Sequence, residues 1–222
     1  MAVTITKKNG PLVLGLDIST KAGVAFLDAR SGEAILTTHL LFHDTAAALA
    51  KKGQPKVKKD PNAPKPKKKD KTPAEYNQYP RWAKYEADFE ALLDAHPGLD
   101  FAVVEGYGFA SQSLSIIVEV SAHFKRVLHR RGIPWIEVKP NALKKFVTGK
   151  GSGDKNVIML EAYKRFGHSF KDDNECDAAM LAYLGLAKVA KSLLPKPLPA
   201  VHLEPLVELP DPMAMVKPKP LT

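Results

Sequence analysis

The first 42 residues alternate short apolar runs with turn residues. Residues 11–20 (PLVLGLDIST) form a compact apolar run that turns polar at its end, and residues 22–29 and 34–42 follow as two further apolar runs. Runs of this length with β-branched residues, bounded by turn residues, are typical of strands. Because the connections between them are short, we expect three consecutive antiparallel strands.

A helical period follows residue 72. Aromatic and aliphatic side chains recur at three- and four-residue spacing between Trp82 and Leu93, and Pro97–Gly98 ends the pattern. Further strands are expected at 99–109 and 134–140, and helices at 113–132, 141–149, 153–167 (with Asp154 as a candidate N-cap) and 174–190. This order predicts an α/β domain of the RNase H-like fold class, a mixed five-stranded sheet flanked by helices.

Two segments have a composition that does not support a core. Residues 51–71 hold ten lysines and four prolines, so we expect a flexible basic insertion there. From residue 193 the chain is rich in proline and has no clear period, so residues 193–222 are expected to form an extended or disordered tail. The remaining chain, residues 1–192, is expected to be one domain around that insertion.

The net charge of +9 is concentrated in two blocks. Residues 51–71 contain ten lysines and two aspartates, a net charge of +8, and residues 121–165 contain eleven Lys or Arg and three acids, again +8. A basic block in foldable sequence favours a polyanionic partner such as DNA. For the lysine run at 51–71, a solvated loop without a partner is an equal alternative.

Several other classes of protein are excluded by composition. No apolar run approaches the roughly 20 residues that a membrane-spanning helix needs, and residues 1–10 do not resemble a secretory signal. The single cysteine, Cys176, excludes an internal disulfide and a cysteine-built zinc site. We therefore expect a cytoplasmic protein without a membrane partner.

Three acidic residues stand where apolar sequence becomes polar. Asp17 follows the run LVLGL, Glu105 follows FAVV, and Asp177 lies in DDNECDAAMLAYL, just before an apolar helical face. Each has a plainer explanation alone: Asp17 can end a strand, Glu105 can precede a turn, and the acids of residues 172–175 can favour a helix N-terminus. Together they predict an oxygen cage for Mg²⁺ or Mn²⁺, as metal-dependent phosphodiester hydrolysis requires.

The chain resembles the RuvC family of Holliday-junction resolvases, especially its phage relatives. The resemblance covers residues 12–190 and rests on LGLDIST, AVVEGYGF, DDNECDAAMLA and, most specifically, PNALKKFVTGKGSGDKNVIMLEAYKRF (140–166). In that last segment Lys144, Gly149, Gly151 and Lys155 match the family pattern without a gap. The departure from the family is the lysine-rich insertion.

The resemblance implies a homodimeric, metal-dependent endodeoxyribonuclease that binds a four-way DNA junction and nicks two strands symmetrically. Other branched DNA or RNA–DNA hybrids are the alternative substrates. The apolar side of residues 113–124 is the expected dimer interface.

The resemblance also implies roles for single residues. Asp17, Glu105 and Asp177 match three of the family's four metal-binding acids. The fourth is expected to be Asp173, one helical turn before Asp177, with Asn174 and Asp172 as alternatives. Lys155 is expected to act at the scissile phosphate. The residues expected to contact DNA are Lys144, Lys145, Lys150, Lys155 and the two aromatic residues that follow Glu105, Tyr107 and Phe109.

Overall fold

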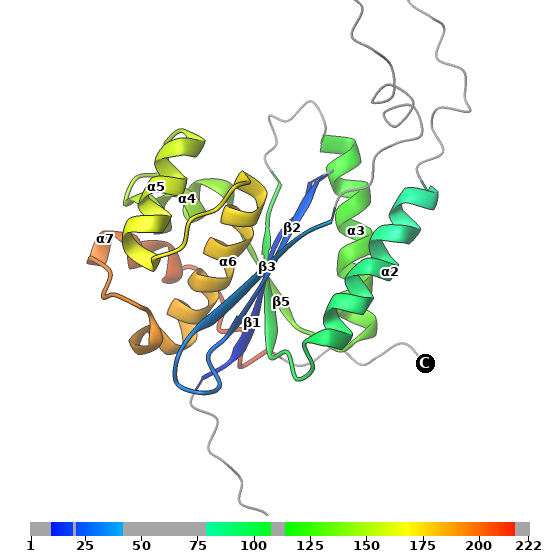
Figure 1. Ribbon diagram of the computed structural model, residues 1–222, viewed down its shortest axis with the longest axis horizontal. Coiled ribbons are helices and arrows are strands. Elements are labelled where there is room, and N and C mark those ends of the chain that lie inside the picture. Colours follow the sequence, from blue (N-terminus) through cyan, green and yellow to red (C-terminus); the bar gives the residue numbers. More distant parts are fainter. Residues whose placement is uncertain (1–9, 20, 42–78, 108–113, 216–222) are drawn as a thin grey trace, which may run out of the picture.

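A five-stranded sheet lies at the centre of the molecule (Figure 1). The computed structural model describes residues 10–19, 21–41, 79–107 and 114–215. The strands are β1 (Leu12–Asp17), β2 (Ala22–Asp28), β3 (Ile35–Leu41), β4 (Phe101–Glu105) and β5 (Trp135–Val138), in the order β3-β2-β1-β4-β5. The β1–β2 and β2–β3 pairs are antiparallel, whereas β1–β4 and β4–β5 are parallel. The expected mixed five-stranded sheet is confirmed.

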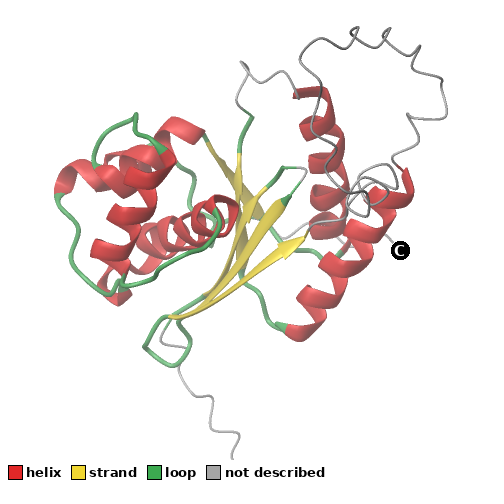
Figure 2. Cartoon of the chain, turned by 45° about the horizontal axis from the view of Figure 1, so that its top comes forward, coloured by secondary structure: helices red, strands yellow, loops and turns green. Residues whose placement is uncertain are grey.

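Helices cover both faces of this sheet (Figure 2). One face carries α2 (Tyr79–Ala95) and α3 (Leu114–Arg130), and the other carries α4 (Pro140–Thr148), α5 (Lys155–Phe166), α6 (Asp173–Ala190) and the short α7 (Ala200–Leu203) (Figure 1). Two short 3-10 helices complete the described chain, η2 (Lys191–Leu193) and η3 (Glu204–Leu206). The predicted helices therefore form, with ends that differ by a few residues.

Alternation along β1 assigns its side chains to two separate cores. Leu12, Leu14 and Leu16 pack in the core under α2 and α3, whereas Val13 packs in the core under α6. Because side chains alternate across a strand, Asp17 points to the same face as Val13, toward α6. The same rule places Glu105 on the α6 face with Phe101 and Val103.

Glycines allow α6 to lie directly on the sheet. A Cβ atom on Gly15 would stand 1.9 Å from the Ala178 carbonyl oxygen, and one on Gly23 would stand 1.9 Å from the Asn174 carbonyl oxygen. Both are far inside van der Waals contact, so any larger residue would push the helix away. The close approach brings the acidic first turns of α6 to the ends of β1 and β4.

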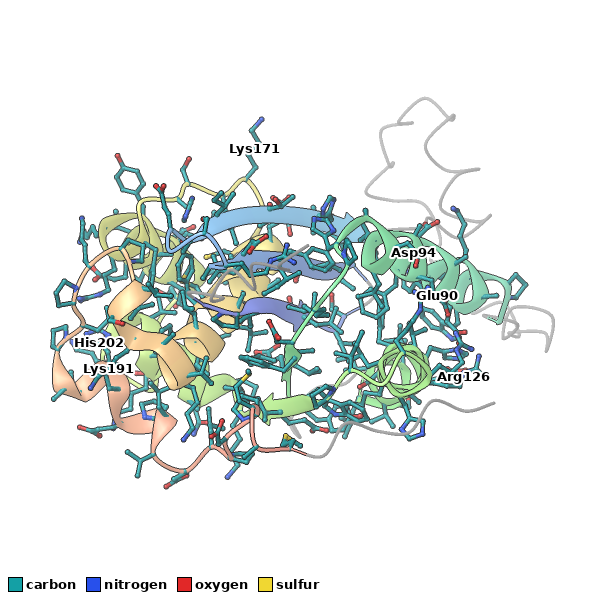
Figure 3. The ribbon with its side chains drawn as sticks, turned by 90° about the horizontal axis from the view of Figure 1, so that it is seen from below. Glu90, Asp94, Arg126, Lys171, Lys191 and His202 are labelled. Atoms are coloured by element: carbon teal, nitrogen blue, oxygen red, sulfur yellow. The ribbon has the colours of Figure 1, made fainter. Side chains whose placement is uncertain are left out.

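Ion pairs join α2 to α3 on the far face. Arg126 donates to both Glu86 carboxylate oxygens at 2.6 and 2.8 Å, and Arg131 pairs with Glu90 at 2.9 Å and with Asp94 at 2.5 Å. Figure 3 shows Glu90, Asp94 and Arg126 gathered on this side. The basic block 121–165 is thus divided, because the arginines of α3 face acids of α2 and only its later lysines lie near α6.

The expectation of an extended tail is wrong for residues 193–215. This part of the chain contains α7 and η3, and His202 and Leu206 within it are only 3% and 8% exposed. Leucines at positions 193, 194, 198, 203 and 209 pack against the α6-side core. The prolines interrupt any regular helical spacing, so the sequence shows no period there. The leucines between them still bury apolar area, which stabilises the packing of this segment on the domain.

Some expectations lie outside the described residues, namely the lysine-rich insertion, residues 72–78 and Phe109. The expected dimer surface on α3 is described in part: Val120 and Phe124 face the core, while Val118 is 42% exposed. Within the described ranges, no helix has the length and apolar character to cross a membrane.

Candidate active site

Asp17 and Glu105 lie side by side at the carboxyl ends of two parallel strands. Each directly follows a paired residue, since Leu16 is in register with Val104. Asp17 is 4% exposed, and its pKa is raised well above 3.8 by burial first and then by the charge of Glu105. Burial also raises the pKa of Glu105, and the hydrogen bond with Asp17 and the charge of Lys144 oppose that rise only in part. The two carboxyl groups share a hydrogen bond, which adds to the raised pKa of Asp17.

The acids of α6 add charge to the same place. Burial, followed by the charges of Glu105 and Asp173, raises the pKa of Asp177 to about 7. Asp177 and Asp173 in turn contribute to the raised pKa of Asp17. Carboxyl groups from β1, β4 and α6 thus act electrostatically on one another. Strongly shifted pKa values of this kind are concentrated at functional sites.

Two lysines face these acids across a cleft of about 280 Å³. Lys155 forms an ion pair with Asp173, and the charge of Lys144 lowers the pKa of both Glu105 and Asp177. The wall of the cleft combines these charged groups with apolar side chains; its lining includes Glu105, Asp177, Lys144, Lys155, Ile18, Tyr107, Ile117 and Ile158. The cleft therefore combines carboxylate oxygen ligands with two cationic side chains.

Asp172 has a structural role at the start of α6, unlike Asp173. It is the N-cap of α6, and its Oδ1 accepts from the Asn174 backbone N–H at 3.0 Å. Its other carboxylate oxygen pairs with Lys21 of the β1–β2 hairpin. Both oxygens are thereby engaged in fixing the start of α6. Of the three residues left open by the sequence, Asp173 is the one whose charge reaches Asp17 and Asp177.

The acids fit a divalent cation in chemistry but are not drawn together into a finished cage. Among the residues that the structure describes, no three His, Cys, Asp or Glu side chains are arranged to hold one ion. The present contacts give the physical reason: Asp17 is hydrogen-bonded to Glu105, and Asp173 is paired with Lys155. Carboxylate oxygens are the donors that Mg²⁺ and Mn²⁺ prefer, so the donor set fits these ions.

The residues expected to contact DNA have different surroundings. The Tyr107 hydroxyl donates to Ser121 Oγ at 3.1 Å, and Lys125 Nζ lies 4.9 Å from the centre of its ring. Its ring is therefore anchored to α3 at the edge of the cleft. Lys145 points to Glu204, with which it forms an ion pair, and Lys150 is exposed just after α4.

Sequence reasoning missed the residues that support the site from a distance. Lys21, Ser121 and His202 carry no motif, and their partners lie 14 to 151 residues away in the chain. His168, which the sequence places in the loop before α6, meets the Tyr183 hydroxyl at 2.8 Å. Asp154 is the N-cap residue of α5, but its side chain makes no capping hydrogen bond.

A scan against protein-family models and a search of curated proteins gave no match to this chain. Two solved structures are similar to it. RuvC from T. thermophilus in complex with Holliday junction substrate has a TM-score of 0.56 at 16% identity, covering 85% of this chain and 99% of that one. A second Thermus thermophilus RuvC structure has a TM-score of 0.52 at 20% identity, covering 84% and 99%. The chain has the RNase H-like fold that these RuvC structures share.

Proposed function

We propose that this protein is a structure-selective DNA endonuclease that resolves four-way junctions by paired, metal-dependent phosphodiester hydrolysis. One observation carries the proposal: Glu105 of β4 and Asp177 of α6 line a cleft together with Lys144 and Lys155, and both carboxylates raise the pKa of the buried Asp17 of β1. Burying so much like charge costs stability, so the arrangement is explained best by a ligand of opposite charge.

Asp17, Glu105, Asp173 and Asp177 would hold Mg²⁺ or Mn²⁺. Bound there, the cations would supply an activated water and charge stabilisation for the leaving oxygen. Lys155 would neutralise the scissile phosphate, because it is 76% exposed and already lies at the acids. Lys144 would contact the neighbouring phosphate from the other side of the cleft. The apolar residues around them keep the local dielectric low, which strengthens these interactions.

The substrate proposal draws on the RuvC neighbour that was solved with Holliday junction substrate. The similarity covers 99% of that protein and 85% of this chain. A homodimer would present two such clefts, and two clefts can nick two strands of a junction symmetrically. Lys150 and the residues that follow Glu105 would contact the junction around each cleft.

The decisive experiment compares four substrates of equal length: a synthetic four-way junction, a linear duplex, a single strand and an RNA–DNA hybrid. We expect paired symmetric nicks in the junction with Mg²⁺ or Mn²⁺, and no cleavage with EDTA or in the Asp177→Asn variant. Preferential cutting of the hybrid would replace the proposal by an RNase H-type activity. No cleavage of any substrate, in the presence of either metal, would refute the nuclease proposal itself.

A further inference from the structure

The C-terminal segment 200–206 packs against α4, next to Gly149 at the start of the glycine-rich loop 149–153. His202 is 3% exposed, and its Nδ1 lies 2.8 Å from the Phe146 carbonyl oxygen in the last turn of α4. A carbonyl only accepts, so Nδ1 carries the hydrogen. The other ring nitrogen faces Gly149, where a Cβ atom would come within 3.1 Å of it. The His202 ring thus packs against the turn that leads from α4 to Lys150.

A side chain of α4 itself also stabilises that turn. Thr148 Oγ1 donates to the Lys144 carbonyl at 2.8 Å and accepts from the Lys150 backbone N–H at 3.1 Å. Gly149 has a φ of +78°, which favours glycine. The turn at Gly149 is therefore contacted both by Thr148, through its hydrogen bonds, and by His202, whose ring packs against it.

The same segment also contacts α6. Leu206 is 8% exposed and belongs to the core under α6. Lys188 of α6 donates to the Leu206 carbonyl oxygen at 2.9 Å. On the α4 side, Glu204 pairs with Lys145. Seven consecutive residues, 200–206, thus connect the helix that carries Lys144 to the helix that carries Asp173 and Asp177 (Figure 1).

We propose that residues 200–206 act as a positioning brace for the active site, with His202 as its central positioning residue. The brace sets where Lys144 and Lys150 stand relative to the acids of α6. Figure 3 places His202 across the molecule from Glu90 and Arg126 of the far face. The catalytic part of this inference rests on the proposed function.

Five variants, one of them a double substitution, test the brace. His202→Leu removes the hydrogen-bond donor at similar volume, and His202→Gln restores an amide donor toward the Phe146 carbonyl oxygen. Val207→Ser is the matched control, because Val207 directly follows the brace and is 82% exposed. Glu204→Lys is a second disruptive variant on the surface, and Lys145→Glu combined with it restores the ion pair with reversed charges.

Two measurements are made at a temperature at which thermal unfolding shows each variant fully folded. Single-turnover cleavage of the four-way junction at saturating protein reports the chemical step, and equilibrium binding reports affinity. Since small misplacements of catalytic groups are costly, we expect His202→Leu to slow the chemical step roughly ten- to a hundred-fold. Affinity should change by no more than about two-fold, because the phosphate contacts remain. His202→Gln should recover most of the rate, and Val207→Ser should match wild type.

Amide hydrogen exchange tests the brace without reference to cleavage. We expect faster exchange in residues 144–153 in His202→Leu and Glu204→Lys, reversal in the charge-swapped pair, and no change in α2 or α3. If His202→Leu does not fold, Glu204→Lys and the charge swap decide by the same readouts. Unchanged exchange in 144–153, or a rate loss that His202→Gln does not recover, would overturn the brace. If wild type cuts no junction, the proposed function fails while the exchange result still decides the brace.

Discussion

Lys155, the first residue of α5, forms an ion pair with Asp173, the first residue of α6. The hydrogen bond that Lys155 donates to Asp173 is the main cause that raises the pKa of Lys155. The pair joins the glycine- and lysine-rich segment to the acidic helix at the mouth of the cleft. It also offsets one of four interacting carboxylates, which is what a bound cation would do in its place.

The first prediction concerns the chemistry of the acids. Asp17→Asn, Glu105→Gln and Asp177→Asn should each reduce junction cleavage by at least about a hundred-fold, since a lost ligand removes transition-state stabilisation. Junction binding should stay intact or tighten, because each change removes negative charge beside phosphates. Cleavage and gel-shift assays measure both effects, with Asp88→Asn on α2 as a charge-matched control. Turnover near wild type in any one variant would exclude that residue from the cage.

The second prediction concerns stability against pH in the absence of metal. The pKa of Asp177 is about 7 in the folded protein against 3.8 in its ordinary range, and that of Asp17 is also raised. A raised acid pKa means that the folded state binds the proton more tightly, so these two groups destabilise the fold least at low pH. Their contribution to stability should fall as pH rises from about 4 to about 7.

Chemical unfolding in EDTA between roughly pH 5 and 8 measures this loss. In that window Glu86 and Glu90, whose pKa values are lowered, stay ionised and do not interfere. The Asp177→Asn variant should be more stable than wild type at pH 8, and its stability should depend less on pH. Addition of Mg²⁺ should stabilise the wild-type protein at pH 8 but not the variant. Because the lowered pKa values of His39 and His168 make stability rise with pH in the same window, the wild-type profile is compared with that of Asp177→Asn. An identical pH dependence in the two proteins would contradict the interacting-carboxylate site.

The third prediction concerns the fourth metal ligand. Asp173→Asn should abolish cleavage, whereas Asn174→Ala should leave it close to wild type. Asp172→Ala should lower the free energy of unfolding by about 1 kcal/mol, because it removes a helix N-cap, and should retain metal-dependent cleavage. Parallel cleavage and unfolding measurements on the three variants separate the ligand from the cap. Full activity in Asp173→Asn would transfer the role to Asn174 or Asp172.

The fourth prediction concerns Lys155. Lys155→Ala should slow the chemical step more than it weakens binding, because a cation beside the reacting phosphate stabilises charge that grows in the transition state. Lys191→Ala is the charge-matched control, since Lys191 follows the opposite end of the 18-residue α6. Single-turnover rates and dissociation constants should be compared. A loss of affinity without a loss of rate would make Lys155 a docking residue.

The fifth prediction concerns the ten lysines of residues 51–71. Replacing residues 52–69 by a short Gly/Ser linker should keep folding and cleavage of saturating junction but weaken binding. Each phosphate contact adds about 0.9 to the slope of log affinity against log salt, so the slope should flatten by several units. Titrations between roughly 50 and 200 mM salt measure it. An unchanged slope would mean that these lysines do not touch DNA.

Much of the fold was predictable from local pattern. Apolar runs and helical spacing depend on neighbours within a few residues, so the five strands and the helices from 79 to 190 could be read directly. The acids were found for the same reason, since Asp17 and Glu105 each end an apolar strand. Parallel neighbours then bring strand ends together, which makes the approach of these two acids a consequence of the element order.

Only the tertiary structure decided which side chains from distant parts of the chain contact one another. The choice among Asp172, Asp173 and Asn174 depends on where α6 starts and on Lys21, 151 residues from Asp172. Lys144 and Lys145 are neighbours on α4 and point in different directions, but only the docking of residues 200–206 brings Glu204 to Lys145. Sequence period records which face of an element is apolar, whereas the partner of a polar side chain is chosen by the three-dimensional packing of those faces.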